Sequence, residues 1–377
     1  MVLGSILIEN EMSAPMYKQD PTAEWKRLLA RSIEAPQELT RWLGRDIALL
    51  KETVQRFPMR INPYYLGLIR EIDDPIYKQC IPDPRELDTQ KGLLDPLAEE
   101  RYSPLPGLTH RYPDRVMFLV SDQCAVYCRF CNRKRKVGRQ GVVTEQTIRN
   151  GLQYIKEHDE IRDVLLSGGD PLLLDTNQLE AILVQLREIP HVQIIRIGTR
   201  VPCTLPQRIT PRLAQTISKF HPVYINTHFN HPAEITPQAA QACSLLADAG
   251  IPLGCQTVLL AGVNDDPETM RELTQRLLGI RVRPYYLFQC DQALGTAHFW
   301  TNPQKGLEII AALVGHTSGL CVPHYCLDLP GGGGKVPLLP QYLQEGNETY
   351  LVVKNYEGKL WKYPIYPQKE QRERRGT

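Results

Sequence analysis

From residue 116 onward, short apolar runs alternate with amphipathic segments along the chain. The apolar runs predict β-strands at Val116–Ser121, Asp163–Ser167, 192–198, 222–228, 253–260 and 281–289. The segments between them predict helices, the clearest lying near 144–157 and where Leu179, Ile182, Leu183 and Leu186 share one face. Strands that alternate with helices indicate a parallel sheet with right-handed crossovers.

The number of these repeats sets the expected architecture. About six βα units are too few for a closed barrel of eight strands, so we expect an α/β fold with a partial, curved (β/α)6-type barrel. In barrels of parallel strands the functional site lies at the carboxyl ends of the strands. The chemically informative segments described below follow predicted strands, which agrees with this placement.

The segments on either side of the barrel have a different pattern. Residues 20–100 are mostly helical and irregular, with apolar residues at helical spacing: Trp25, Leu28, Leu29 and Ile33, then Leu43, Ile47 and Leu50. After the barrel, a stretch beginning at Tyr350 alternates as a strand does, and the charged end after Lys369 is expected to be disordered. We therefore predict a mostly helical region at 1–105, the barrel at 106–335 and a C-terminal extension at 336–377.

Composition narrows the class of protein. The chain has 377 residues and a formal net charge of +2, from 44 basic and 42 acidic residues, which gives no electrostatic reason to expect a nucleic-acid or membrane partner. No apolar run approaches the roughly 20 residues of a membrane span. The N-terminus has no basic region before its short apolar stretch, so we expect no signal peptide. With ten cysteines and no export signal, a reduced, cytoplasmic setting is expected.

Three cysteines at the spacing C-x3-C-x2-C introduce specific chemistry. Cys124, Cys128 and Cys131 closely follow the first predicted strand. Three thiolates can bind three irons of a [4Fe–4S] cluster and leave the fourth open, whereas a cluster used only for electron transfer normally takes four cysteines. A zinc site would require a fourth Cys or His at short range, and none follows within the next few tens of residues. The spacing resembles the signature of radical S-adenosylmethionine (SAM) enzymes, which implies that the open iron binds SAM.

Two glycine-rich segments predict further ligand sites. The second predicted strand ends in Ser167-Gly168-Gly169-Asp170, where glycine permits either a tight βα turn or close approach of the backbone to a ligand. This segment resembles the radical SAM motif that holds the amino group of SAM. Farther along, four glycines at 331–334 precede Lys335 without the register, or the following Ser or Thr, of a phosphate-binding P-loop. Apart from a flexible linker, this run suits a lysine that forms an imine with pyridoxal 5′-phosphate (PLP).

The cysteine loop, the glycine turn and the glycine–lysine run, in this order, resemble the lysine 2,3-aminomutase family. The similarity extends over most of the chain, including segments 107–115, 196–202, 228–232 and 286–291. It implies that Lys335 carries PLP and that Arg111 and Arg115 hold the PLP phosphate, for which a planar guanidinium is suited. Without the resemblance, these arginines would be interpreted as surface ion pairs of a solvated loop.

The same resemblance implies how a substrate is read. Arg133 would bind the substrate carboxylate, and Asp291 and Asp328 would bind the distal ammonium of lysine. Two carboxylates in one closed pocket repel each other, and a cationic side chain relieves that conflict. The plain alternatives are a helix N-cap before 292–298 for Asp291 and a turn residue for Asp328. The implied activity is the PLP-dependent radical SAM interconversion of L-lysine and β-lysine by 1,2-amino migration.

One departure from the family concerns zinc. Well-studied members bind zinc between subunits through cysteines in the C-terminal tail and one on a neighbouring helix. Here no cysteine follows Cys326, and the helix position holds Asp266. We therefore expect no zinc, and a homo-oligomer stays an open question.

Several alternatives remain on sequence alone. The same mechanism could act on another cationic amino acid such as arginine or ornithine, or supply β-lysine for the modification of a translation factor. From a different class, a non-enzymatic iron–sulfur carrier would leave Lys335 and the acid pair without a purpose. An enzyme of this type needs a reductase, flavodoxin or ferredoxin as electron donor, besides its small-molecule amino acid substrate.

Overall fold

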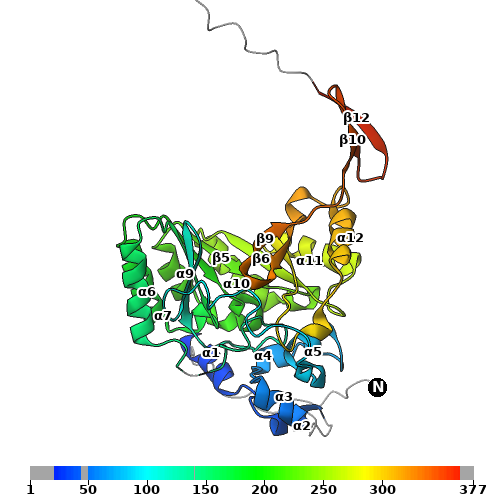
Figure 1. The fold of residues 1–377 in the computed structure, drawn as a ribbon. Helices are drawn as coiled ribbons and strands as arrows, with labels where there is room; N and C mark the ends of the chain where they lie inside the picture. Colours follow the sequence, from blue (N-terminus) through cyan, green and yellow to red (C-terminus); the bar gives the residue numbers. More distant parts are fainter. Residues whose placement is uncertain (1–20, 44–49, 140, 366–377) are drawn as a thin grey trace, which may run out of the picture.

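The computed structural model describes residues 21–43, 50–139 and 141–365. One sheet of nine strands lies at the centre of the molecule (Figure 1), and its strands are ordered as in the sequence, from β1 at one edge to β9 at the other. Strands β2 to β8 are parallel, whereas β1 and β9 run antiparallel to their neighbours at the two edges. The strands are β1 (Leu108–Tyr112), β2 (Arg115–Ser121), β3 (Asp163–Gly168), β4 (Ile194–Gly198), β5 (Val223–Thr227), β6 (Leu253–Leu259), β7 (Arg283–Gln289), β8 (His324–Leu329) and β9 (Gly334–Pro337).

Helices connect the parallel strands. They are α6 (Glu145–Glu157), α7 (Thr176–Arg187), α8 (Val201–Thr204), α9 (Pro211–Ser218), α10 (Pro237–Asp248), α11 (Pro267–Gly279) and α12 (Pro303–Leu313). Four of them begin with a proline directly after a polar residue whose side chain accepts a backbone N–H of the first turn: Thr210, Thr236, Asp266 and Asn302. Proline suits this position because its missing N–H would have no partner within the helix. Local sequence therefore fixes where these helices start.

The predicted barrel is confirmed and extended. All six predicted strands are present as β2 to β7, α6 matches the helix expected near 144–157, and the four apolar residues predicted to share a face of α7 are buried. The sheet also contains a seventh parallel strand, β8, and the antiparallel edge strands β1 and β9. Sequence periodicity did not reveal β8 and β9, because polar residues and the glycine run interrupt the apolar pattern there.

The N-terminal region lies over the end of the barrel that carries the cysteines. Its helices are α1 (Pro21–Ala30), α2 (Pro36–Leu43), α3 (Leu50–Arg56), α4 (Pro63–Leu66) and α5 (Pro75–Cys80). The buried Asn62 side chain donates to the carbonyls of Ala125 and Thr204, at 3.2 and 2.8 Å, and Trp25 packs with Ala125 in a small apolar cluster. Because Ala125 belongs to the cysteine loop, this region shields that loop from solvent.

The C-terminal extension contains a separate antiparallel sheet of β10 (Leu343–Gly346), β11 (Tyr350–Lys354) and β12 (Leu360–Pro364). Figure 1 shows it standing apart from the barrel, and β11 confirms the strand-like alternation predicted from Tyr350. The boundaries at 105 and 335 remain predictions, and β9 continues to Pro337. Ile47, the first twenty residues and the charged end after Lys369 lie outside the described residues. Within the described ranges, no helix has the length and apolar character to cross a bilayer.

Candidate functional site

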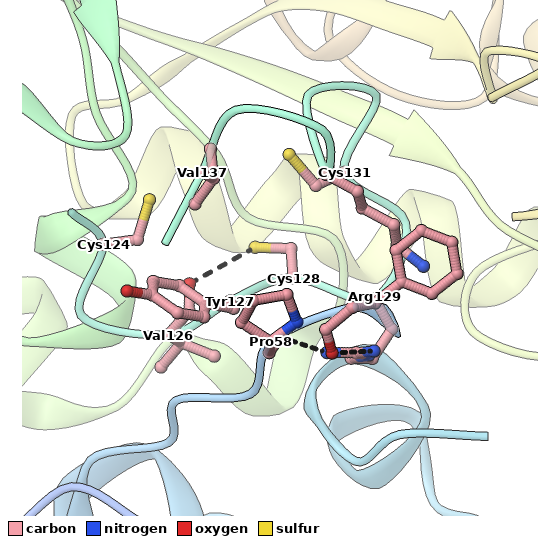
Figure 2. Close-up of a pocket in the computed structure, with 10 residues that line it drawn as sticks. Pro58, Cys124, Val126, Tyr127, Cys128, Arg129, Cys131 and Val137 are labelled. Carbon is pink, nitrogen blue, oxygen red and sulfur yellow. Dashed lines mark hydrogen bonds between the residues drawn. The ribbon is translucent and has the colours of Figure 1, made fainter. Parts of the chain in front are cut away.

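The three cysteines of the motif line a single pocket in the loop after β2. Figure 2 shows Cys124, Cys128 and Cys131 around this pocket, together with Pro58 from the N-terminal region and other apolar side chains. All three motif cysteines are partly exposed, whereas the other seven cysteines of the chain are buried. The motif thiols are therefore the ones placed to bind a ligand.

The surroundings of Cys124 and Cys131 favour the protonated form of these two thiols until a metal binds. Desolvation raises the pKa of Cys131 to about 11 and holds the pKa of Cys124 well above its ordinary range. Iron must displace these protons, as metals bind the thiolate form of cysteine. Among the described residues, no group of three or more His, Cys, Asp or Glu side chains is arranged to hold a single metal ion. Thiols spread around a pocket instead fit a cubane, in which each thiolate binds a different iron.

The glycine turn after β3 lies against the cysteine loop. A Cβ on Gly168, whose φ is +128°, would lie 2.1 Å from the carbonyl oxygen of Ser121, and a Cβ on Gly169 would lie 2.3 Å from that of Gln123. The backbones meet through hydrogen bonds from Gly169 N to Ser121 O and from Asp170 N to Gln123 O, both 2.7 Å. Only glycine permits this approach. The turn predicted to hold SAM is thus placed beside the predicted cluster, although the same glycines are already required by packing.

Asp170 is satisfied by donors of the protein itself. Its carboxylate accepts from the Thr199 hydroxyl at 2.6 Å and from the backbone N–H groups of Arg200 and Leu172 at 2.7 and 3.0 Å. Burial raises its pKa to about 6 despite these hydrogen bonds. Asp170 therefore ties the end of β3 to the end of β4 and fixes the turn, while Ser167 remains partly exposed beside it.

Lys335 lies in β9, in register with Asp328 of β8. Its ammonium forms an ion pair with the Asp328 carboxylate and lies 4.8 Å from the centre of the Phe288 ring. The second carboxylate oxygen of Asp328, Oδ1, is buried and has no hydrogen-bond partner within the described part of the chain. A buried acceptor without a partner is costly, so this oxygen is positioned for a donor from a ligand.

Asp291 follows β7 and lies near the same group. Its Oδ2 accepts a hydrogen bond of 2.7 Å from the side-chain amide of Asn132. Asn132 directly follows Cys131, the last motif cysteine. Burial and the neighbouring Asp328 carboxylate raise the pKa of Asp291 to about 6, against the lowering effect of Asn132, Lys335 and Arg133. Asp291 is not a helix N-cap, because the next helical turn spans Ala297–Phe299 and begins after Thr296.

Arg133 is held by a buried acid that sequence analysis did not identify. Its Nε donates to Glu99 Oε1 at 2.7 Å, and the Glu99 side chain also pairs with Arg135 at 2.9 Å. Despite burial, which opposes the charged form, the neighbouring carboxylates raise the pKa of Arg133 above its ordinary value. The guanidinium is therefore charged and fixed in orientation at the edge of the acid pocket. The negative charge of Asp291 contributes to the raised pKa of Arg133.

Arg111 and Arg115 meet around Tyr112. Their guanidinium carbons lie 5.2 and 4.0 Å from the centre of the Tyr112 ring, and the Tyr112 hydroxyl accepts from the backbone N–H of Lys335 at 3.2 Å. Gly334 has a φ of +101°, and a Cβ there would lie 3.1 Å from Arg111 Nη2. Arg115 also pairs with Asp114 at 2.8 Å. The fold thus brings both predicted phosphate ligands to the predicted PLP lysine.

The site therefore forms two adjoining groups. The first contains the motif cysteines and the glycine turn, and the second contains Lys335, the acid pair and the arginines. Asn132 links them, because it belongs to the cysteine loop and donates to Asp291. Sequence analysis assigned no role to Tyr112, Glu99, Asn132 or Arg200. Tyr112 and Arg200 lie within segments that carry the family resemblance, which was the available signal, whereas pairing over long sequence separations concealed Glu99.

Comparison with known proteins identifies the class first. A family model described as the radical SAM superfamily matches residues 118–274, which run from β2 to α11 and include the cysteine loop. The matched residues form most of the parallel sheet, so this part of the chain is similar to the radical SAM superfamily. A second model, described as lysine-2,3-aminomutase, matches residues 310–375.

Curated relatives then define the family. The chain is 49% identical to the L-lysine 2,3-aminomutase of Acetoanaerobium sticklandii over 352 residues, or 92% of this chain and 85% of the relative. It is also 49% identical to the L-lysine 2,3-aminomutase of Clostridium subterminale over 347 residues, 90% of this chain and 83% of that protein. A glutamate 2,3-aminomutase of Clostridioides difficile is 49% identical over 321 residues, which are 84% of this chain and 76% of the relative. The chain therefore belongs to the lysine 2,3-aminomutase family.

Proposed function

We propose that this chain is a radical SAM, PLP-dependent 2,3-aminomutase that interconverts L-lysine and β-lysine. Percentage identity supports the reaction type but does not by itself choose the amino acid, because an L-lysine 2,3-aminomutase and a glutamate 2,3-aminomutase are both 49% identical to the chain over the residues matched. The substrate must therefore be inferred from the charges in the pocket.

The observation that carries the proposal is the ion pair between Asp328 and the Lys335 ammonium, with Asp291 beside it. Here a primary ammonium already balances the charge of one member of the acid pair, Asp328. PLP held on the Lys335 amine would remove that partner from Asp328, and a substrate ammonium could take its place beside Asp328 and Asp291. A glutamate side chain would instead add a third negative charge to the pocket, which Coulomb repulsion opposes.

The residues present fit the three cofactors of this family. Cys124, Cys128 and Cys131 would hold the [4Fe–4S] cluster, and the turn from Ser167 to Asp170 beside them would hold SAM. The Lys335 amine and the paired arginines Arg111 and Arg115 would hold PLP. When bound, these groups supply a carbon-centred radical and an electron sink for the migrating amino group.

The chain's own residues bind, orient and shield the substrate. Arg133, fixed by Glu99, would donate to the substrate carboxylate, while Asp291 and Asp328 would hold the far ammonium. Fixing both ends of a flexible amino acid selects one conformation of the carbons between them. The N-terminal region over the cysteine loop excludes water, which protects a radical from side reactions.

The acid pocket favours a cationic amino acid but does not choose among the cationic alternatives. Arginine and ornithine carry cations of other shape and reach, so they remain competitors that a direct assay must rank. Supply of β-lysine for a translation factor would use the same chemistry. A plain iron–sulfur carrier would not explain the grouping of Lys335, Asp328 and Asp291. We further propose a cytoplasmic enzyme that takes electrons from a reductase, flavodoxin or ferredoxin and that is open to self-association.

The test is anaerobic reconstitution with iron, sulfide, SAM and PLP, followed by turnover of lysine, ornithine, arginine and glutamate. We expect β-lysine from lysine and little product from glutamate. Preference for ornithine or arginine would redirect the substrate assignment but preserve the reaction type. Preference for glutamate would overturn the role given to Asp291 and Asp328.

A further inference from the structure

Arg200, two residues after the end of β4, lies beside the cysteine loop. Its Nη1 donates to the Cys128 sulfur at 2.8 Å. The residue is only 8% exposed, and its Nε is buried with no hydrogen-bond partner within the described ranges. A buried guanidinium with one donor on a motif thiol places a fixed positive charge beside that sulfur.

A buried network holds this guanidinium in place. Its Nη2 donates to Glu234 at 2.6 Å, to Gln79 at 2.5 Å and to the Tyr65 hydroxyl at 3.1 Å. Glu234, Gln79 and Tyr65 are fully buried, and Glu234 also accepts the backbone N–H groups of Asn230 and His231. The N-terminal helices and the loop after β5 thus clamp the side of Arg200 that faces away from Cys128.

The backbone N–H of Arg200 makes a second contact. Its N–H donates to Asp170 at 2.7 Å, and Asp170 fixes the glycine turn after β3. One residue therefore contacts a motif cysteine through its side chain and the glycine turn through its main chain. A shift of Arg200 would change the position of both.

We infer that Arg200 is a positioning residue of the [4Fe–4S] cluster, which donates to the Cys128 thiolate and keeps that ligand in register with the glycine turn. This inference rests on the cluster assigned in the proposed function. Hydrogen bonds to the sulfur ligands and nearby positive charge stabilise the reduced, more negative cluster and raise its reduction potential. Arg200 would therefore make the cluster easier to reduce.

The experiment is an EPR-monitored redox titration of the reconstituted full chain and its variants. Arg200→Gln removes the charge and should make one-electron reduction at least tenfold less favourable, a shift of about 59 mV to lower potential. Arg200→Lys keeps the positive charge but lacks the paired N–H donors of a guanidinium. The reduction potential of this variant should therefore shift less than that of Arg200→Gln. The matched control is Arg187→Gln, because Arg187 donates to backbone carbonyls of Val192, Gln193, Phe220 and Pro222 at the opposite ends of the strands. It should leave the potential unchanged.

A second measurement keeps the inference testable if Arg200→Gln does not assemble a cluster. In wild-type enzyme labelled with ¹⁵N in the arginine guanidinium groups, pulsed EPR of the reduced cluster should detect ¹⁵N coupling, which Arg200→Lys should lose. Full iron with an unchanged potential in Arg200→Gln, or no ¹⁵N coupling in the wild type, overturns the inference. A wild type without a [4Fe–4S] signal would instead contradict the proposed function itself.

Discussion

Asp328 and Lys335 face each other across the β8–β9 hairpin, and their side chains form an ion pair. The register of the hairpin fixes this relationship, since a slip of one residue would turn Lys335 to the opposite face of the sheet. The chain between them turns through Gly331 and Gly332, whose φ values of +68° and +86° favour glycine. The glycine run is therefore a tight return that presents the lysine to its acid, and this excludes the interpretation as a loose linker.

Replacing Lys335 should abolish PLP binding without affecting the iron–sulfur cluster. We expect Lys335→Ala to lose the PLP absorbance band and all turnover, because no amine remains to bind the aldehyde, while iron content stays at the wild-type level. Absorbance spectra and iron analysis of the reconstituted variant check this. Lys305→Ala, a surface lysine of α12 that pairs with Glu308, is the control and should behave as wild type. Borohydride trapping of PLP on another lysine would contradict the assignment.

The acid pair should determine which amino acid is used. Removing one partner of a buried, charge-assisted contact costs about 2–5 kcal/mol, or roughly 30- to several-thousand-fold in kcat/KM. Asp291→Asn and Asp328→Asn should each lower kcat/KM for lysine by this amount while SAM and PLP still bind. Asp248→Asn, which breaks an exposed ion pair with Arg281, should have no effect. Normal lysine turnover in both pocket variants would contradict the substrate assignment.

Arg133 should affect substrates of either side-chain charge. It would read the carboxylate that all α-amino acids share, so Arg133→Gln should raise KM for lysine and for any slower substrate by a similar factor. The measurement compares the KM ratios of lysine and ornithine in wild type and variant. A loss confined to lysine would place Arg133 at the side chain instead.

The pH dependence should reveal Asp291. Burial and Asp328 raise its pKa from the ordinary 3.8 to about 6, so kcat/KM for lysine should fall as the pH drops through about 6. The free energy of unfolding of the cofactor-free protein should change in the opposite sense. Between about pH 4 and 6 the folded state keeps a proton that the unfolded chain releases, so stability decreases as the pH rises.

Asp291→Asn should abolish the acidic limb of the kcat/KM profile and part of the stability change. Asp170 has its pKa raised to about 6 as well, chiefly by burial, so the remaining part should persist in this variant. Rate profiles and denaturant titrations across pH 4–8 provide the measurement. An acidic limb retained in Asp291→Asn would assign it to another group.

The cysteines should divide into two classes. Cys124→Ala, Cys128→Ala and Cys131→Ala should each abolish cluster assembly, because two remaining thiolates cannot hold the cubane. Cys243→Ala is the matched control, since this buried cysteine of α10 lies in the apolar core, and the variant should keep its full iron content. Iron analysis distinguishes the two classes. Full iron content in any motif variant would contradict the assignment of the three motif cysteines as cluster ligands.

Sequence patterns predicted the strands of the barrel well because each is a short apolar run bounded by turns, as at Val116–Ser121. They also singled out the residues that the structure groups around Lys335. They could not reveal the partners that hold these residues. Glu99 pairs with Arg133, and Arg200 reaches Glu234 and Gln79, through contacts that only the folded sheet creates. A spacing rule describes neighbours along one element, whereas these pairs depend on how distant elements pack.

The curled sheet has a consequence for how ligands enter. Between neighbouring strands, opening would break a ladder of backbone hydrogen bonds, but the described residues show no ladder between β1 and β9. There Lys335 N–H donates a hydrogen bond to the Tyr112 hydroxyl, and Arg111 lies where it would meet a side chain at Gly334. One such bond contributes about 0.5–1.5 kcal/mol. The described edges of the barrel thus meet at a seam without a backbone ladder, and this seam runs past the lysine that we propose to hold PLP.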